Sequence, residues 1–293
     1  MVENIIEIHN LSRCFGSKNA LKDVSLSVPR GTVFGLVGEN GAGKSTLIKH
    51  ILGLWRAEAG QVRVFGHDPV SNPVAVLERI GYLSEQPDLP DWMRVYEYMR
   101  YMQAFYPKWD VPYAESLRAQ FGVDRNARVR VLSKGQRAKL GLLAAQAHRP
   151  DLLLLDEPSS GLDPIVRNDI LTAVIRTVAD EGRTVFFSSH LLEEIERVSD
   201  HVAMLHQGRL VLYGPLDRIK AQHRRITLRF ETPQPKAPLI PGALSVNGAG
   251  REWTVICNRQ RSQIQSLTMS FGTEIVGEDA ASLNEVFIAH ANA

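Results

Sequence analysis

The sequence predicts an α/β fold: a parallel sheet core covered by helices, with an antiparallel part before it and a small α+β extension after it. Three observations lead to this class. Val33–Val37 is a strand-like run before a glycine-rich turn and a helix, Leu152–Leu155 is wholly apolar, and strands alternate with helices from residue 150 to residue 213. Continuous apolar runs are typical of strands buried on both faces, and helices between strands imply parallel connections.

The N-terminal part is expected to carry antiparallel strands beside the Val33–Val37 strand. Ile5–Ile8 and Ser25–Val28 are strand-like and lie on either side of a polar turn at residues 16–19. After the helix Thr46–Leu52, the segment Gly60–Gly66 alternates apolar and polar residues between two glycines, which is typical of an edge strand.

A helical insertion is predicted over residues 86–148. It follows the short strand Ile80–Leu83 and a loop marked by two prolines. Three helices are expected in it from apolar residues at helical spacing: Val95–Phe105, Tyr113–Phe121 and Arg137–His148. The last is opened by Ser133 and Gln136, whose spacing fits a capping box.

The core continues with a helix, a strand, a helix and a hairpin: Pro164–Ala179, Thr184–Phe187, Leu191–Val198, and His201–Leu205 paired with Arg209–Tyr213. A domain boundary is expected near residue 220, which gives a domain over 1–220 and a small accessory domain over 221–293. The accessory domain is expected to contain the strand Ile226–Phe230, a proline-rich arm, two further strands around a helix between Asn258 and Met269, and a capping-box helix, Ser282–His290.

Composition excludes several classes of protein. The 293 residues carry a net charge of +2, which lacks the basic footprint of a dedicated nucleic-acid binder. Cys14 and Cys257 are the two cysteines, too few for a disulfide framework or a cysteine metal site. The N-terminus does not resemble a signal peptide, and no run of about 18 apolar residues occurs. Any membrane role is therefore expected to depend on a partner.

The stretch Gly38–Thr46 fits the phosphate-binding pattern G-x-x-x-x-G-K-[ST] between a strand and a helix. Gly41 and Gly43 let the backbone turn tightly and present N–H groups to phosphate oxygens at the helix N-terminus. Lys44 is expected to reach the terminal phosphates, and the Ser45 hydroxyl to bind Mg²⁺. The sequence therefore predicts a binding site for a nucleoside triphosphate.

Two carboxylates follow the apolar run Leu152–Leu155. Asp156 would hold the water shell of Mg²⁺, and Glu157 would polarise a water for attack on the γ-phosphate. His190, just after a strand, would contact that phosphate or hold the water. By themselves, the carboxylates would also fit a solvated strand end, and His190 a packing or surface histidine.

These motifs, with Leu132–Gln136 and Ser160–Asp163 between them, resemble the nucleotide-binding subunit of ABC transporters over residues 1 to about 220. The resemblance implies an ATPase that uses ATP and Mg²⁺, with Phe15 stacked on adenine, Glu157 as general base and His190 as γ-phosphate sensor. It implies an ATP-binding set of Phe15, Gly38, Glu39, Asn40, Gly41, Ala42, Gly43, Lys44, Ser45 and Thr46. It also implies a signature set that contacts ATP of the other subunit, Ser133, Lys134, Gly135 and Gln136, a cross-dimer Asp163, and metal ligands Ser45, Asp156 and Glu85.

Two positions depart from the family pattern. Lys134 replaces a usual glycine and adds a positive charge near the phosphate of the other subunit. Where the family usually has a glutamine, the sequence has Glu85 followed by Gln86, and alignment with Ile80–Leu83 favours Glu85. The Glu85 variant and the C-terminal extension are similar to the ABC-2 exporter type. Residues 105–110 and 132–136 are similar to the bacterial branch encoded beside GntR-type regulators.

The function expected is that of an ATP-hydrolysing motor subunit on the cytoplasmic face of the membrane. Two copies, or one copy and a paralogue, would enclose two Mg-ATP head to tail and drive a separate permease, with export as the direction. The aromatic segment Trp92–Trp109 is the candidate permease contact, although core packing explains its residues about as well. Two alternatives are a soluble ABC-type ATPase that acts on the ribosome or DNA, and a nucleotide switch that hydrolyses poorly.

Overall fold

The computed structural model describes residues 3–179, 182–258 and 273–291. The chain divides into two compact units, Met1–Leu210 and Val211–Ala293, here called unit 1 and unit 2. The boundary that the sequence predicts, near residue 220, falls later in the chain, within α8 (Leu216–Gln222). Within the described ranges, no helix combines the length and the apolar character that a membrane crossing needs.

A sheet of six strands in the order β5-β6-β7-β3-β8-β9 forms the centre of the fold. Their bounds are β3 Val33–Val37, β5 Ile80–Leu83, β6 Leu152–Asp156, β7 Thr184–Ser189, β8 His201–His206 and β9 Arg209–Pro215. The pairs β5–β6, β6–β7, β7–β3 and β3–β8 are parallel, which confirms the predicted fold class. Every residue of β3, β6 and β7 is buried, as the apolar runs Val33–Val37 and Leu152–Leu155 indicate for the first two.

An antiparallel sheet of three strands, in the order β2-β1-β4, makes up the N-terminal part of unit 1. Its strands are β1 Asn4–Phe15, β2 Lys18–Pro29 and β4 Ala59–Val64. β4 lies at an edge, as predicted, but β1 and β2 are longer than the sequence indicates. Register shifts interrupt their pairing, and Asn10 and Asp23 have positive φ angles there. Such bulges break the alternation of apolar and polar residues. The sequence pattern therefore predicts only Ile5–Ile8 of β1 and Ser25–Val28 of β2.

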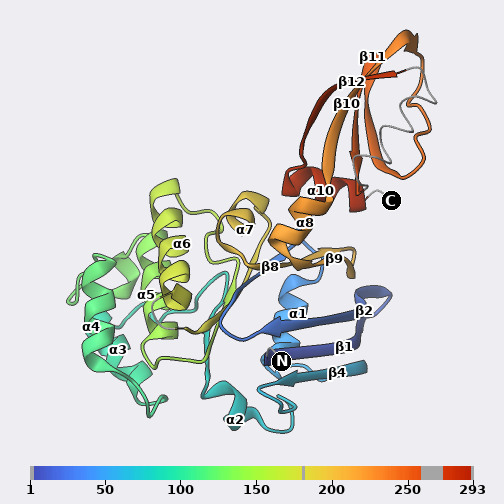
Figure 1. Ribbon diagram of the computed structural model, residues 1–293. Coiled ribbons are helices and arrows are strands. Elements are labelled where there is room, and N and C mark those ends of the chain that lie inside the picture. The colour runs from blue at the N-terminus through green and yellow to red at the C-terminus, as the bar shows by residue number, and fades with distance from the viewer. Residues whose placement is uncertain (1–2, 180–181, 259–272, 292–293) are drawn as a thin grey trace. The chain divides into compact units, whose positions relative to one another are not determined.

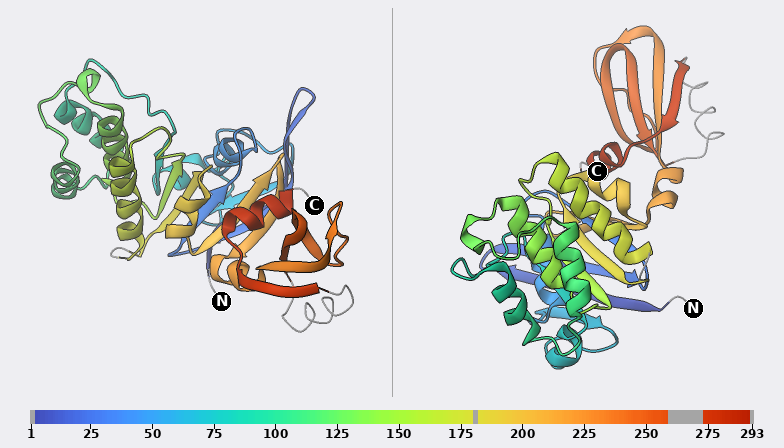
Figure 2. Two further views of the ribbon diagram at one scale, coloured as in Figure 1. Left: turned by 90° about the horizontal axis from the view of Figure 1, so that it is seen from above. Right: turned by 90° about the vertical axis from the view of Figure 1, so that its left-hand side faces the viewer.

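The helices of unit 1 include the predicted helical insertion (Figures 1 and 2). Their bounds are α1 Lys44–Ile51, α2 Pro73–Leu77, α3 Val95–Gln103, α4 Val111–Gln120, η1 Val129–Val131, α5 Lys134–Gln146, α6 Pro164–Ala179 and α7 Leu192–Val198. α3, α4 and α5 gather at one end of unit 1. α5 begins at Lys134 rather than at the predicted Arg137, because Ser133 caps it. The sequence interpretation did not include α2.

Unit 2 is an α+β structure with a sheet in the order β11-β10-β12. Its elements are α8 Leu216–Gln222, β10 Arg224–Gln234, β11 Ala243–Cys257, β12 Thr273–Ala280 and α10 Leu283–Ala291. Alternate residues of β10, including Ile226, Leu228 and Phe230, form a core with Trp253 of β11. Ser282 and Glu285 cap α10 reciprocally, as predicted. The helix expected between Asn258 and Met269 lies outside the described residues.

Candidate active site

The phosphate-binding loop joins the end of β3 to the start of α1. Its backbone needs glycine, because φ is 82° at Gly41 and 110° at Gly43. A Cβ at Gly43 would also approach the carbonyl oxygen of Ala20 to 2.5 Å, closer than any real side chain comes. The strand–turn–helix geometry that the sequence predicts is therefore present, and it brings backbone N–H groups to the N-terminus of α1.

Lys44 lies inside this loop with 5% of its surface exposed. Its ammonium group donates hydrogen bonds to the carbonyl oxygens of Gly38 and Glu39, at 2.6 and 3.2 Å. It also forms an ion pair with Glu157, 3.0 Å from Oε1. The loop thus holds one buried cation next to the carboxylate that the sequence assigns as the base.

Glu157 connects Lys44 to His190. Its other oxygen, Oε2, accepts a hydrogen bond from the His190 Nδ1 at 2.7 Å and from the His190 backbone N–H at 3.3 Å. Since a carboxylate only accepts, Nδ1 carries the proton, and Nε2 is left for another contact. Three residues predicted from three separate motifs therefore form one continuous chain of contacts.

A serine of the neighbouring strand holds Asp156 beside Lys44, Glu157 and His190. The Ser188 hydroxyl donates to Asp156 Oδ1 at 2.7 Å and accepts from the Glu157 backbone N–H at 3.0 Å. Burial, and then the negative charge of Asp156, raise the pKa of Tyr82 to about 12. Asp156 thus contributes a negative charge at the carboxyl end of β6.

A cavity of about 470 Å³ opens over the loop. It is lined by Phe15, Lys18, Ala20, Asn40, Gly41, Gly43, Lys44, Ser45, Thr46, Glu85 and Glu157. The prediction also included Gly38, Glu39 and Ala42. These residues do not line the cavity but form part of the loop beneath it. Lys18 and Ala20 were missed, because Lys18 belongs to a segment that indicated only a polar turn.

Phe15 forms the aromatic part of the cavity wall, with 41% of its surface exposed. Its ring lies edge-on to Trp55, with 5.1 Å between ring centroids, and the Arg13 guanidinium lies 4.9 Å from its centroid. These contacts fix one end of the cavity as an apolar, planar surface, which suits the stacking of a base.

Glu85 and Gln86 differ in their access to the cavity above the loop. Glu85 lines the cavity above the loop, and its Oε1 accepts a hydrogen bond from the Ser160 hydroxyl at 3.3 Å. Glu85 and Gln86 both line a smaller pocket of about 160 Å³, together with Lys134 and Leu162, but Gln86 does not line the cavity above the loop. Of the two residues left open by the sequence, Glu85 is the one that faces the loop.

Three side chains with oxygen ligands, Ser45, Glu85 and Asp156, lie in or beside the cavity. The described residues include no cluster of three or more histidine, cysteine or carboxylate side chains suited to a metal ion. Mg²⁺ is usually held by one or two carboxylates, with phosphate oxygens and waters in the other positions. Ser45 and Glu85 in the cavity and Asp156 beside it match such a sparse set.

The four signature residues lie apart from this cavity, at the N-terminus of α5. The Ser133 hydroxyl accepts from the Gln136 backbone N–H at 3.2 Å, and the Gln136 side chain accepts from the Ser133 N–H at 3.0 Å, which confirms the predicted capping box. The Lys134 ammonium lies against Gly161, so that a Cβ there would meet it. Asp163 caps α6 by accepting from the N–H groups of residues 165 and 166. The predicted residues therefore form two groups.

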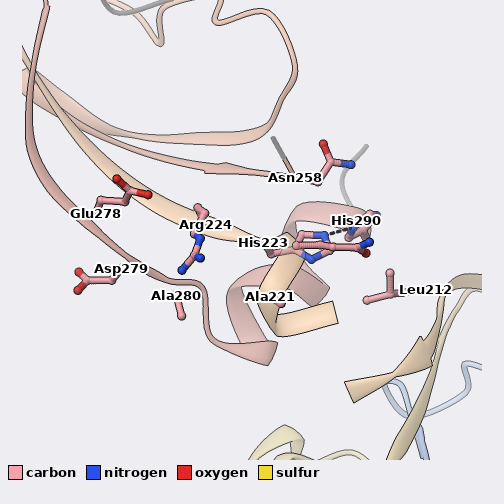
Figure 3. Close-up of a pocket in the computed structure, with 10 residues that line it drawn as sticks. Leu212, Ala221, His223, Arg224, Asn258, Glu278, Asp279, Ala280 and His290 are labelled. Atoms are coloured by element: carbon pink, nitrogen blue, oxygen red, sulfur yellow. Dashed lines mark hydrogen bonds between the residues drawn. The ribbon is translucent and has the colours of Figure 1, made fainter. Parts of the chain in front are cut away.

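Unit 2 contains an open pocket of about 1090 Å³ lined by His223, Arg224 and His290 among other residues (Figure 3). The His223 Nδ1 lies 2.7 Å from the carbonyl oxygen of Ile219 and must donate to it. Its Nε2 therefore accepts from the His290 Nε2, 3.0 Å away. Burial, and then the nearby His223, lower the pKa of His290. The pair thus links the end of α8 to α10 by a hydrogen bond.

Comparisons with known proteins agree with the site. The profile of the ABC transporter family matches residues 21–160. The ABC transporter ATP-binding protein YtrB of Bacillus subtilis is 31% identical over 285 residues, which make up 97% of this chain and 97% of that protein. The chain belongs to the ATP-binding subunits of ABC transporters. Members of this family hydrolyse ATP, so the chain is an ATPase.

Two further matches support the same assignment. The bacitracin transport ATP-binding protein BcrA of Bacillus licheniformis is 31% identical over 76% of this chain and 74% of that protein. A solved ATP-binding subunit of an ABC transporter is 31% identical with a TM-score of 0.68, and the match covers 74% of this chain and 92% of that one. The alternative of an ABC-type ATPase that acts on the ribosome or DNA gains no support from these matches.

Proposed function

We propose that two ATPase subunits, either two copies of this chain or one copy and a paralogue, close head to tail around two Mg-ATP. The observation that carries this proposal is the separation of the signature residues from the cavity above the phosphate-binding loop. Ser133, Gly135 and Gln136 lie at a helix N-terminus, which favours phosphate. A second subunit would therefore supply the γ-phosphate contacts that the cavity's own lining does not include.

Within each site, residues of this chain divide the binding of Mg-ATP between them. Phe15 stacks on adenine, and the loop from Gly38 to Thr46 surrounds the phosphates. Lys44 neutralises their charge, and the bound ion would be held by Ser45, Asp156 and Glu85, directly or through water. Mg²⁺ supplies charge neutralisation between the phosphate groups.

Hydrolysis requires a base next to the attacking water. Glu157 takes the proton from water as the water oxygen attacks the γ-phosphorus, and the bond between that phosphorus and the bridging oxygen to the β-phosphate breaks. The hydrogen bond from Nδ1 of His190 orients the Glu157 carboxylate and leaves Nε2 of His190 to contact the γ-phosphate. Lys44 stabilises charge that builds on the leaving side.

The permease contact is assigned to the aromatic segment Trp92–Trp109 at the start of the helical insertion. Trp92, Tyr101 and Phe105 expose 70%, 46% and 61% of their surfaces, and such residues are enriched where proteins dock. Glu85, which lines the cavity, precedes this segment. It would transmit the closure of the ATPase dimer to the permease. Similarity to a bacitracin transport protein supports a role in transport, for which we propose export as the direction and the inner face of the membrane as the location.

Affinity isolation of the chain from detergent-solubilised membranes of its own host tests the coupling. Recovery of a protein with several apolar spans, more of it with a non-hydrolysable ATP analogue, is expected. Replacing Trp92 and Phe105 by alanine should reduce this recovery. Leu54→Ala, which changes an apolar residue exposed to 61% outside the segment, should not. Isolation of the chain without any membrane protein would contradict the proposal.

A further inference from the structure

A buried carboxylate lies behind the two segments that carry the proposed base and the proposed γ-phosphate sensor. Glu194 belongs to α7, and only 4% of its surface is exposed. The Ser159 hydroxyl lies 2.7 Å from both of its carboxylate oxygens. The Ser189 hydroxyl donates to its Oε2 at 2.7 Å as well. One side chain therefore receives hydrogen bonds from the turn after β6 and from the last residue of β7.

The charge of this carboxylate is balanced from α6. The Nε of Arg167 lies 3.2 Å from the Glu194 Oε1. Burying a carboxylate is costly unless it is paired and hydrogen-bonded, and well-packed apolar residues often replace buried ion pairs without loss of stability. Packing alone therefore does not account for a carboxylate here, whereas the need to fix two hydroxyl groups does.

The positions of the two serines in the chain connect Glu194 to the proposed base and the proposed γ-phosphate sensor. Ser159 comes two residues after Glu157, at the end of β6, and Ser189 comes directly before His190, at the end of β7. β6 and β7 are neighbours in the parallel sheet. Glu194 thus joins the turn after β6 to the carboxyl end of β7.

The backbone of Glu157 needs such support. Its φ angle is 49°, a left-handed conformation that residues other than glycine adopt rarely and keep only where their surroundings fix them. On one side, the Ser188 hydroxyl accepts the Glu157 N–H. On the other side, Ser159 is held by Glu194. The strained residue is therefore fixed from both directions along the chain.

We propose that Glu194 is a positioning residue for ATP hydrolysis. By accepting hydrogen bonds from Ser159 and Ser189, it fixes the two segments so that the Glu157 carboxylate and the His190 Nδ1 stay at 2.7 Å. This inference rests on the proposed roles of Glu157 and His190. It adds to them a link from α7 through the serines to the reacting groups.

Glu194→Gln in the full chain tests the link, with Glu193→Gln as the matched control. The two residues are adjacent on α7, but Glu193 is exposed. Gln removes the charge and one acceptor from a side chain of the same size. The expected loss for Glu194→Gln is about tenfold or more in kcat, because small displacements of reacting groups are costly. The KM for ATP should stay within about twofold, since Phe15 and Lys44 are untouched.

The control variants separate positioning from general loss of structure. Glu193→Gln should keep the wild-type kcat. Ser159→Ala and Ser189→Ala, which remove one hydroxyl each, should lower kcat without raising KM, and their effects should not add fully to that of Glu194→Gln. If Glu194→Gln fails to fold, the two serine variants carry the test alone.

The results also distinguish this inference from the proposed function. A wild-type kcat in Glu194→Gln, or in both serine variants, would overturn the positioning role, as would a rise in KM at unchanged kcat. Glu157→Gln, measured in parallel, reports on the base itself. Full turnover in Glu157→Gln would overturn the proposed function, whereas an inactive Glu157→Gln beside a fully active Glu194→Gln would overturn only the inference.

Discussion

The two groups of predicted site residues in unit 1 differ in how many contacts their side chains make within the chain. The buried group lies around the phosphate-binding loop, and the exposed group lies at the N-terminus of α5. In the buried group, Lys44 and Glu157 expose 5% and 6% of their surfaces and contact each other. In the exposed group, Ser133 and Lys134 lie at the surface, and the Ser133 hydroxyl bonds only within its own capping box among the contacts described.

This difference is what the proposed head-to-tail pairing of subunits leads us to expect. The buried group is preorganised: backbone carbonyls, Ser188 and Glu194 hold the reacting side chains in place. The exposed group is rigid as well, because it opens a capped helix, but its polar groups face outward. In the proposed dimer, the exposed group of one subunit would meet the buried group of the other.

The largest effect is expected from Glu157→Gln in the buried group. Loss of the general base should lower ATP turnover by about 100-fold or more. ATP binding should persist, because the loop around Lys44 is unchanged. Lys44→Ala should behave differently and weaken ATP binding itself. Turnover and nucleotide affinity, measured together on both variants, check this contrast, and a Glu157→Gln chain with wild-type turnover would refute the base assignment.

A smaller effect is expected from Ser133→Asp in the exposed group. Aspartate caps a helix as well as serine does, so α5 should remain folded. Its negative charge would face a phosphate of the other subunit, and such juxtaposed like charges cost several kcal/mol. Turnover should fall by about 10- to 100-fold, with ATP binding to the single chain unchanged. Ser133→Asn, a neutral cap of similar size, should lose much less.

Mixing the two inactive chains tests the comparison directly for the homodimer. In a head-to-tail dimer of Glu157→Gln with Ser133→Asp, one site combines both defects and the other combines two intact groups. Random mixing should restore about a quarter of wild-type turnover if the two sites act independently, since half of the dimers are mixed. If the mixture stays as inactive as its components, the two groups do not meet across copies of this chain.

The buried group was predictable from sequence because its residues follow strands with unmistakable patterns. Val33–Val37 and Leu152–Leu155 are continuous apolar runs, and parallel strands bring their carboxyl ends to one edge. Glu194 was not predictable, because a glutamate in a polar helix usually faces water. Only the structure shows that its side chain turns inward to Ser159 and Ser189.

The N-terminal sheet and the cavity wall show a second limit of prediction from the sequence. The long strands β1 and β2 depend on bulges, which are set by pairing between distant residues and not by local alternation. Lys18 follows the turn between them and reaches the cavity only because β1 and β2 pair up to Phe15. Distant pairing of this kind leaves no periodic signal in the sequence.

The smallest effect is expected away from both groups, at His148. His148 lies just after α5, the helix that begins with the signature residues, and its Nε2 donates to the carbonyl oxygen of Ile80 in β5 at 3.1 Å. Its ring stacks on Tyr106 with centroids 3.9 Å apart, and 1% of its surface is exposed. Burial lowers the pKa of His148 to about 4.

Acid should therefore destabilise the fold through His148. The unfolded chain takes up a proton on His148 near pH 6.5, whereas the folded chain resists it until about pH 4, so stability falls as the pH drops through this window. Between about pH 7.5 and about pH 5 the loss should be about 2 kcal/mol. His148→Gln keeps an N–H for Ile80 and does not titrate, so urea unfolding should show a weaker pH dependence by this amount. The exposed His67→Gln serves as the control, and an unchanged pH dependence in His148→Gln would show that the buried imidazole does not set it.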